Sequence, residues 1–348
     1  MSEWEVLAVT KLEGDLIIFF SGSEKMTALR RITDLVERGL KVSGLLTTFI
    51  NFDRNAYKLM KYLHDNYDVK LMLDSGAYSF MMAYWYMTGQ MGNSPNKRAL
   101  DMLKYNRVSW YFERYIRFLK KEIDYFDVYV ELDLQHIPQI GMEKVLEWRE
   151  RFSKEDLEPV LVWHGEKLEE IHKYMVPYSS RLGFPRILPE GWTRAEANEL
   201  IGMILADFDI NWIHLFGVTK WNVVSELHRK GLISSADSTS WLSARMFGWL
   251  FYIDGDGSLK TFDYSKRQRD KPEVLDEVRR YRDFLERYRE ELVEFGIKWD
   301  DVYNFRDWDE MNYVNLIAFN WALEKLNREI REKGKRRGKV QSTLFSYI

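Results

Sequence analysis

The sequence contains no cysteine, no long apolar run and no excess of positive charge. Without cysteine the chain can form no disulfide, no thiolate nucleophile and no zinc site with cysteine ligands, which suits a reducing compartment. No run of about 18 apolar residues occurs, so we expect no membrane partner and an intracellular, cytoplasmic protein. The net charge of −3 gives no overall cationic field, so any binding of nucleic acid must use local patches.

The pattern of apolar residues predicts a barrel. A chain of 348 residues, 46% of them hydrophobic, is long enough for one large barrel and an appendage. Eight short apolar runs alternate with mostly amphipathic helical stretches, at residues 16–22, 43–50, 70–76, 126–134, 159–165, 181–185, 212–218 and 233–239. Eight such units predict an α/β fold, a (β/α)8 TIM barrel. The sixth and eighth runs have weak β propensity, which leaves the count open by one.

We divide the chain into three parts. Residues 1–265 are expected to form the barrel, with a long insertion at 77–124 that is crowded with aromatic residues and methionine. The insertion is either a helix packed across the barrel mouth or a lid that stacks a base. Residues 266–334 predict two charged helices, a C-terminal helical extension that caps the barrel. Residues 335–348 combine a basic linker with a short terminal peptide.

Two aspartates stand where buried strands are expected to end. Asp74 follows the apolar run KLML, and Asp237 lies in LISSADSTSW. In a parallel barrel the carboxyl ends of the strands share one pocket, and paired carboxylates there can cleave a glycosidic bond. The alternative is that each aspartate only caps the helix that follows it.

Other polar residues fall at the same predicted face of the barrel. They lie in or just after the third to seventh runs: Ser75, Gly76, Asp133, Gln135, His136, His164, Gly165, Gly183 and Gly217. Buried aspartate and histidine need polar partners, so a cluster of them predicts a hydrated functional site at the open end of the barrel.

The order and spacing of these residues resemble the tRNA-guanine transglycosylase superfamily. That family has Asp-Ser-Gly-Gly-Phe-Gln after its third strand, and residues 74–79 here read Asp-Ser-Gly-Ala-Tyr-Ser. Its Gly-Val-Gly at the seventh strand is similar to residues 216–218, Phe-Gly-Val, and its Phe-Asp at the eighth strand is similar to Ala236-Asp237. The likeness covers roughly residues 15–250, and its weight lies in the order of short motifs.

The resemblance implies roles for individual residues. Asp237 would be the nucleophile, which attacks C1′ and forms a covalent intermediate, and Asp74 the general acid and base. Asp133, in VELDLQ, would bind the donors of a guanine-like base, and His164 would replace the glutamine of the family's Val-Gln-Gly. The resemblance assigns the remaining substrate contacts to Gly183, Ser75, Gly76 and Gly217. Tyr78 or Trp163 could stack on the base, with core packing as the alternative for each.

Two departures from the family narrow the expectation. The Cys, Cys, Cys, His zinc site of the bacterial and eukaryotic members is absent, so we expect no metal, and no cofactor. The sequence also shows no obvious domain of the kind that archaeal members append for tRNA binding. Both features resemble the shorter branch that places 7-deazaguanines, such as 7-cyano-7-deazaguanine, into DNA. The implied reaction replaces guanine in DNA with a 7-deazaguanine base, and the target nucleotide would be flipped or single-stranded.

The terminal residues resemble a PCNA-interacting peptide. Gln341, Leu344, Tyr347 and Ile348 follow the basic stretch KGKRRGKV, with the aliphatic residue three positions and the aromatic six positions after the glutamine. Such a peptide docks on a sliding clamp (PCNA) in one tight turn, which fits a DNA substrate and an archaeal or viral origin. The alternative is that the tail packs back on the helical extension.

Three other functions stay open. The chain could be a tRNA transglycosylase that lacks zinc, a catalytically inactive barrel that binds DNA while tethered to a clamp, or an ordinary glycoside hydrolase. A hydrolase needs two carboxyl groups beside a sugar, but it needs neither Asp133 nor the tail.

Overall fold

A computed structural model describes residues 12, 14–22, 25–185, 193–217, 220–265 and 270–345 of the chain. For residues 334–345 the description is limited to the helix that contains them.

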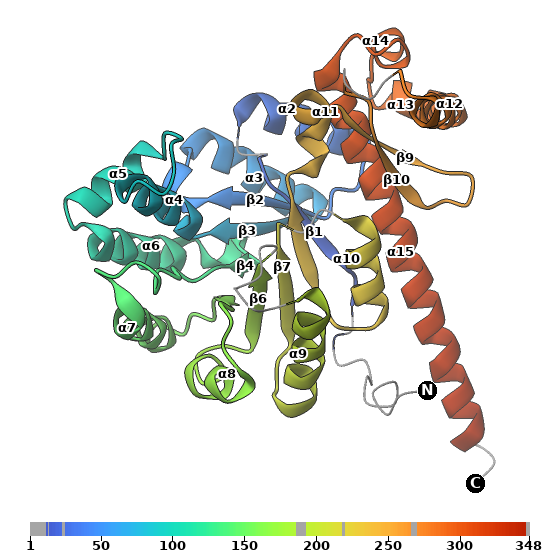
Figure 1. Cartoon of the computed structure of the whole chain (residues 1–348). Helices are drawn as coiled ribbons and strands as arrows, with labels where there is room; N and C mark the ends of the chain where they lie inside the picture. Colours follow the sequence, from blue (N-terminus) through green and yellow to red (C-terminus); the bar gives the residue numbers. More distant parts are fainter. Residues whose placement is uncertain are drawn as a thin grey trace.

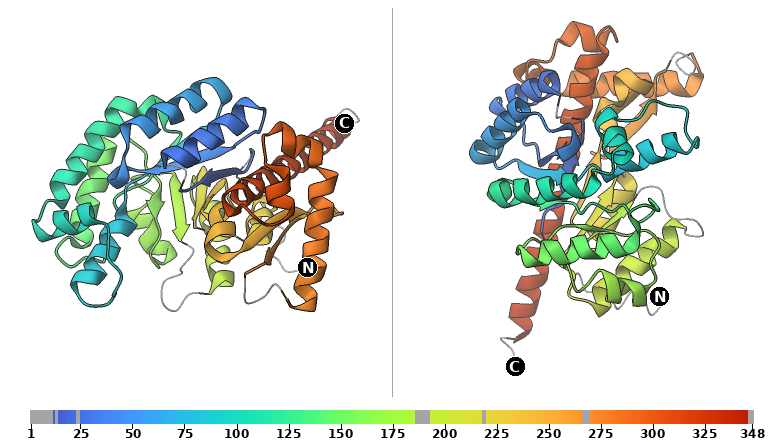
Figure 2. Two further views of the ribbon diagram at one scale, coloured as in Figure 1. Left: turned by 90° about the horizontal axis from the view of Figure 1, so that it is seen from above. Right: turned by 90° about the vertical axis from the view of Figure 1, so that its left-hand side faces the viewer.

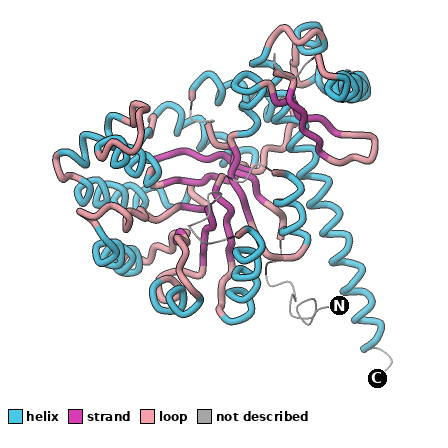
Figure 3. The backbone as a smooth tube through the Cα atoms, in the orientation of Figure 1, coloured by secondary structure: helices cyan, strands magenta, loops and turns pink. Residues whose placement is uncertain are grey.

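Eight parallel strands form a (β/α)8 barrel, as the sequence predicts (Figures 1 and 3). Each predicted run contains one strand: β1 (Ile17–Phe20), β2 (Gly44–Thr48), β3 (Lys70–Asp74), β4 (Val128–Tyr129), β5 (Leu161–Val162), β6 (Arg181–Pro185), β7 (Trp212–Phe216) and β8 (Ser235–Ser238). Hydrogen-bonded neighbours follow the order β4-β3-β2-β1-β8-β7-β6-β5. A parallel bridge between Val130 and Val160 joins the two ends of this order, so the sheet closes on itself.

Helices surround the strands, as two further views show (Figure 2). They are α2 (Met26–Glu37), α3 (Arg54–Tyr67), α6 (Val108–Glu122), α7 (Gly141–Lys154), α8 (Leu168–Tyr174), α9 (Arg194–Asp207) and α10 (Trp221–Arg229), with short 3-10 turns η1 (Phe49–Asn51) and η2 (Ile123–Tyr125). Helix α2 buries Leu29, Ile32 and Val36, the spacing of an amphipathic helix that faces a core on one side.

The insertion at 77–124 folds as helices. Helices α4 (Ala77–Met87) and α5 (Lys97–Lys104) are additional to the barrel, and α6 packs on the strands as an ordinary barrel helix. The residue before α4, Gly76, has φ of 87°, and a Cβ there would lie 2.9 Å from side-chain atoms of Ile50. Glycine is therefore required for the sharp turn from β3 into α4.

The C-terminal part differs from the two-helix cap expected from the sequence. After β8 come η3 (Ser240–Leu242), α11 (Ser243–Phe247), an antiparallel hairpin of β9 (Trp249–Ile253) and β10 (Leu259–Asp263), α12 (Pro272–Arg287), α13 (Arg289–Glu294), α14 (Trp299–Tyr303) and α15 (Trp308–Phe345). The first expected helix is interrupted at Tyr288, because that residue leaves helical geometry between α12 and α13.

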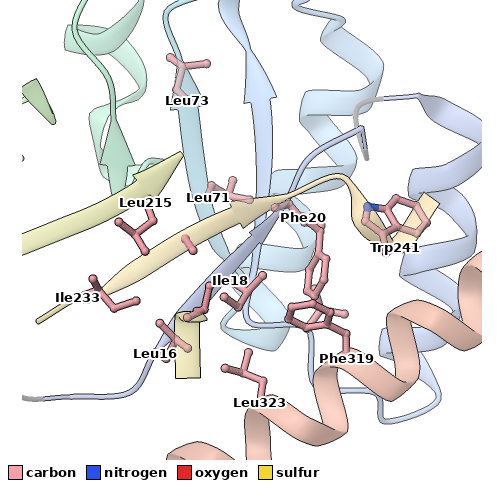
Figure 4. Close-up of a cluster of buried hydrophobic side chains, with 14 of the residues drawn as sticks. Leu16, Ile18, Phe20, Leu71, Leu73, Leu215, Ile233, Trp241, Phe319 and Leu323 are labelled. Atoms are coloured by element: carbon pink, nitrogen blue, oxygen red, sulfur yellow. The ribbon is translucent and has the colours of Figure 1, made fainter. Parts of the chain in front are cut away.

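Helix α15 lies along the barrel wall. Figure 4 shows Phe319 and Leu323 of this helix against Leu16, Ile18 and Phe20 at the start of the barrel. The rings of Phe20 and Phe319 meet edge-on, with centroids 5.7 Å apart. The side-chain amide of Asn327 accepts from the Leu16 amide at 2.9 Å and donates to the Leu16 carbonyl at 3.1 Å. Helix α15 thus occupies the place of the eighth barrel helix.

The predicted linker at residues 335–345 is a continuation of α15. Lysine and arginine have good helix propensity, which lets the helix continue past Gly338. None of the helices in the described ranges is long and apolar enough to cross a membrane.

Candidate active site

Several predicted site residues lie at the carboxyl ends of the barrel strands. Phe19, Leu46, Met72, Val130 and Val162 form an apolar cluster inside the strands. Side chains alternate across a strand, so the next inward position lies two residues further toward the carboxyl end. That step leads from Met72 to Asp74 and from Val162 to His164.

Asp237 is held by hydrogen bonds from two neighbouring strands. Its Oδ2 accepts from the Ser21 hydroxyl, just after β1, at 3.0 Å. Its Oδ1 accepts from the Gly217 amide, just after β7, at 2.7 Å. Asp237 is only 9% exposed, so these donors replace water around most of the carboxylate. They do not resemble a helix cap: in the described structure no backbone amide that follows Asp237 donates to its carboxylate.

His214 adds a third donor to Asp237. Its Nε2 lies 3.3 Å from Asp237 Oδ1, and its Nδ1 lies 2.8 Å from the hydroxyl of Ser235. A carboxylate can only accept, so Nε2 carries a proton. The imidazole is fully buried beside the ring of Phe216, with centroids 4.4 Å apart. Sequence analysis did not identify His214, although it lies two residues before Phe216 and therefore on the inward face of β7.

Asp133 and His164 form the second pair. The Oδ2 of Asp133 lies 2.8 Å from Nε2 of His164. Burial alone lowers the pKa of His164, but the hydrogen bond and charge of Asp133, with the charges of Glu166 and Glu131, outweigh it and raise that pKa. Among the described residues, no donor is hydrogen-bonded to the other oxygen, Asp133 Oδ1. One oxygen of Asp133 thus remains for a ligand.

A buried ion pair fixes the segment that leads to Asp133. Glu131 accepts from Nε and Nη2 of Arg149, each at 2.7 Å, and from the Val162 amide at 2.8 Å. Burial acts to lower the pKa of Arg149, but the charge and hydrogen bonds of Glu131 raise it, so the guanidinium is charged. Since Glu131 and Val162 each lie two residues before a member of the Asp133 and His164 pair, this contact aligns that pair.

Asp74 ends β3 beside a buried tyrosine. The Tyr111 hydroxyl donates to the Ser75 carbonyl at 2.5 Å. Burial raises the pKa of Tyr111, and the nearby charge of Asp74 raises it further. Ser75 is fully buried and its hydroxyl accepts from the Ala77 amide at 3.4 Å, so its side chain supports the turn.

Gly183 is packed tightly inside the barrel. A Cβ at this position would lie 2.2 Å from the ring of Phe216 and 3.0 Å from Val160. Its carbonyl accepts from the Trp163 amide at 2.9 Å. Close packing inside the barrel is therefore sufficient to explain this glycine.

The two aromatic candidates for stacking on a base have opposite environments. Trp163 is fully buried, and its indole donates to the Glu166 carbonyl at 2.8 Å, so it belongs to the core. Tyr78 is 65% exposed in the first turn of α4, four residues after Asp74. Core packing, the alternative weighed for both residues, applies only to Trp163.

Gln135 has an unusual environment in the loop that follows Asp133. Both of its amide atoms are buried, and neither has a hydrogen-bond partner in the described part of the chain. A buried polar group without a partner costs about 1–3 kcal/mol, so a ligand or water that satisfied it would bind favourably. The sequence shows Gln135 at the mouth but gives no sign of this unsatisfied state.

The predicted residues therefore form three groups at this end of the barrel. Asp237 contacts Gly217, and Asp133 contacts His164. Asp74, Ser75 and Gly76 form the adjoining turn at the end of β3. Gln341 and Leu344 lie on α15 with side chains outside the described part, and Tyr347 and Ile348 lie outside the described residues. Within the described ranges, no group of three or more aspartate, glutamate or histidine residues is arranged to hold a metal ion.

Comparison with known proteins adds no family assignment: no protein-family model matches the chain, and no curated protein matches it.

Proposed function

We propose that the chain is a pentosyltransferase that exchanges guanine in DNA for a 7-deazaguanine derivative through a covalent aspartyl intermediate. The observation that supports it most directly is that three strands of one barrel, β3, β4 and β8, carry Asp74, Asp133 and Asp237 at or just beyond their carboxyl ends. Barrel enzymes use this end for chemistry.

Asp237 is the proposed nucleophile. Base exchange at C1′ passes through an oxocarbenium-like state, which a carboxylate below the sugar can trap. The donors from Ser21, Gly217 and His214 hold the carboxylate in one orientation, which favours attack from a fixed direction. Asp74 is the proposed acid and base, which protonates the departing guanine and deprotonates the incoming base.

Asp133 and His164 are the proposed base-recognition pair. Asp133 Oδ1 would accept from the N1 and 2-amino donors of a guanine-like base while Oδ2 stays bonded to His164. Adenine presents an acceptor at N1 and would leave the carboxylate unpaired, which gives strong discrimination. Tyr78, exposed in the first turn of α4, would stack on the same base.

The test is incorporation of labelled guanine, and then of labelled 7-cyano-7-deazaguanine, into DNA and into tRNA by the purified protein. We expect label in DNA. Asp237→Asn should lower the rate by about a thousandfold or more, because it keeps the shape and removes the charge that traps C1′. Asp254→Asn, an aspartate in the β9–β10 turn, is the matched control.

Each result separates the alternatives. Label in tRNA alone would support the zinc-free tRNA enzyme, and no label in either would leave the DNA-binding barrel or a hydrolase. A denaturing gel of wild type with a DNA oligonucleotide and no free base should show a covalent adduct that Asp237→Asn cannot form. Exchange at a normal rate by Asp237→Asn would refute the nucleophile.

We also propose that the end of the chain docks on a sliding clamp (PCNA). The support is the pattern of Gln341, Leu344, Tyr347 and Ile348 after a basic stretch. The full chain should bind an archaeal clamp with a Kd of about a micromolar, since a few buried anchors supply about 8 kcal/mol. Leu344→Ala with Tyr347→Ala should abolish binding and leave base exchange on naked DNA unchanged. A lower melting temperature with unchanged clamp binding would mean that the tail packs on its own protein.

A further inference from the structure

The junction between α5 and α6 exposes two large aromatic side chains. Tyr105, the residue that follows α5, is 68% exposed, and Trp110, in the first turn of α6, is 50% exposed. The neighbouring residues Val108 and Tyr111 are buried, so the helix has a core-facing side and Trp110 is not on it. Exposed tryptophan and tyrosine only five residues apart in sequence indicate a binding surface.

Each exposed ring has an arginine over its face. The guanidinium carbon of Arg107 lies 5.7 Å from the centre of the Tyr105 ring, and that of Arg114 lies 4.8 Å from the centre of the Trp110 ring. Both arginines are exposed. We call Tyr105, Arg107, Trp110 and Arg114 the α5–α6 corner.

The charge of the surrounding insertion is opposite to that of the whole protein. Residues 77–124 contain eight lysines and arginines and four aspartates and glutamates, in a chain of net charge −3. A local excess of positive charge on an acidic protein selects a polyanion at that place and not elsewhere.

The corner lies at the same end of the barrel as Asp74. Tyr111, next to Trp110, donates to the Ser75 carbonyl, and Arg98 of α5 donates to the Ile50 carbonyl just after β2 at 3.0 Å. Burial and the charge of Asp74 raise the pKa of Tyr111, while the charges of Arg114 and Arg98 act to lower it. Asp74, the proposed acid and base, and Arg114 of the corner therefore both lie within electrostatic range of the Tyr111 hydroxyl.

We propose that the α5–α6 corner binds a single-stranded stretch of the nucleic acid next to the flipped nucleotide, with bases stacked on Tyr105 and Trp110 and phosphates on Arg107 and Arg114. This inference rests on the proposed function, which requires the target nucleotide to leave a duplex or to be unpaired. Aromatic rings give stacking without sequence preference, and arginines follow the backbone. The corner thus adds affinity for the strand and takes no part in the bond-breaking step.

The experiment measures binding of a labelled single-stranded DNA of about 20 nucleotides by fluorescence anisotropy. Tyr105→Ala and Trp110→Ala should each weaken binding about 5- to 100-fold. Arg107→Gln and Arg114→Gln should each reduce the slope of log affinity against log salt concentration by about 0.7. An oligoribonucleotide of the same sequence shows whether RNA uses the surface equally.

Trp299→Ala is the matched control. Trp299 also has an arginine over its ring, Arg289 at 4.8 Å, but it begins α14, which Figure 1 shows on the opposite side of the molecule from α5 and α6. Its variant should bind the oligonucleotide like wild type. Melting temperatures of all variants exclude loss of folding.

Different results would refute the proposed function and the role of the α5–α6 corner. Failure of wild type to exchange bases would refute the proposed function, whatever the binding data show. Equal binding by wild type, Tyr105→Ala and Trp110→Ala, or no binding by wild type, would refute the corner as a strand-binding surface. If Trp110→Ala instead converted a dimer to a monomer in sedimentation, with oligonucleotide binding unchanged, the surface would be an interface between two copies of the chain.

Discussion

Asp237 receives donors from residues that only the folded barrel brings together. Ser21 and Asp237 are 216 residues apart in sequence, and His214 and Asp237 are 23 apart. The hydroxyl, the amide of Gly217 and the imidazole leave little freedom to the carboxylate. Precise placement of reacting groups accounts for a large part of the rate of many reactions, so the partners of the proposed nucleophile should matter almost as much as Asp237 itself.

His214→Phe tests the contribution of the imidazole donor. The substitution keeps a planar ring in the buried site and removes the donor to Asp237, so base exchange should fall about 100-fold with a smaller change in KM. His214→Gln can place an amide donor near the position of Nε2 and should recover part of the rate. Equal rates for the Phe and Gln variants would show that His214 only fills space beside Phe216.

His164 provides a prediction on pH. Its pKa is raised in the folded protein, so its ion pair with Asp133 stabilises the fold fully below the unfolded pKa of about 6.5 and is lost as the pH rises through the folded pKa. The difference in free energy of unfolding between wild type and His164→Gln should therefore be larger at pH 6 than at pH 9. Urea unfolding at both pH values measures it, and a difference that grew with pH would contradict the assigned charge state.

The sequence predicted the carboxylates but not their partners. Asp74, Asp133 and Asp237 lie at or near the ends of three predicted strands, so their position could be expected, although the run around Asp237 has weak β propensity. The contact of Asp133 with His164 depends on how β4 and β5 align, and that of His214 with Asp237 on the register of β7 and β8. Such long-range alignment is not encoded in any local pattern.

The seam between β4 and β5 is the weakest part of the barrel by backbone pairing. Each strand has only two residues, and one bridge, from Val130 to Val160, connects them. The Glu131 carboxylate extends this seam, because it accepts from the Val162 amide while Arg149 of α7 neutralises it. A side chain here takes the place of a missing main-chain partner.

Arg149→Met tests how far the seam depends on the Glu131 ion pair. It leaves a buried carboxylate without its counter-charge, so the free energy of unfolding should fall by about 3–5 kcal/mol. Lys154→Met, which removes an exposed partner of Glu150 on the same helix, should change it by about 1 kcal/mol or less. Chemical denaturation measures both. Similar losses from the two variants would mean that the seam does not depend on the Glu131 pair.

Local pattern predicted the eight strands and missed the C-terminal elements for physical reasons. The turn Asp254-Gly255-Asp256-Gly257 between β9 and β10 is a typical hairpin signal, but both flanking strands lie beyond a barrel that the first eight runs had already completed. The amphipathic spacing continues through Tyr288, so nothing local separates α12 from α13. The bend depends on packing, with Tyr288 and Trp321 of α15 in ring contact at 4.7 Å.

The C-terminal helix α15 packs against the first strand and completes the wall of the barrel. Asn315 of α15 accepts from the Phe251 amide at 2.8 Å, and Asn327 bonds both backbone groups of Leu16. Helix α15 thus connects the β9–β10 hairpin to the entry of β1. Among the α15 side chains that the structure describes, the last one packed against the core is Ile330.

The last prediction follows from that division of α15. A chain ending at Asp307 loses Phe319, Leu323 and Asn327 and exposes the apolar surface of β1, so it should fail to fold and should be recovered as an aggregate.

A chain ending at Lys333 keeps every one of those contacts and should melt within a few degrees of the full chain. It should also exchange bases on naked DNA at the normal rate, because the proposed chemistry lies at the strand ends. Binding to a sliding clamp should be the one property it loses. A large drop in melting temperature for this second chain would show that residues 334–348 belong to the fold, and clamp binding that survived would place the docking peptide elsewhere.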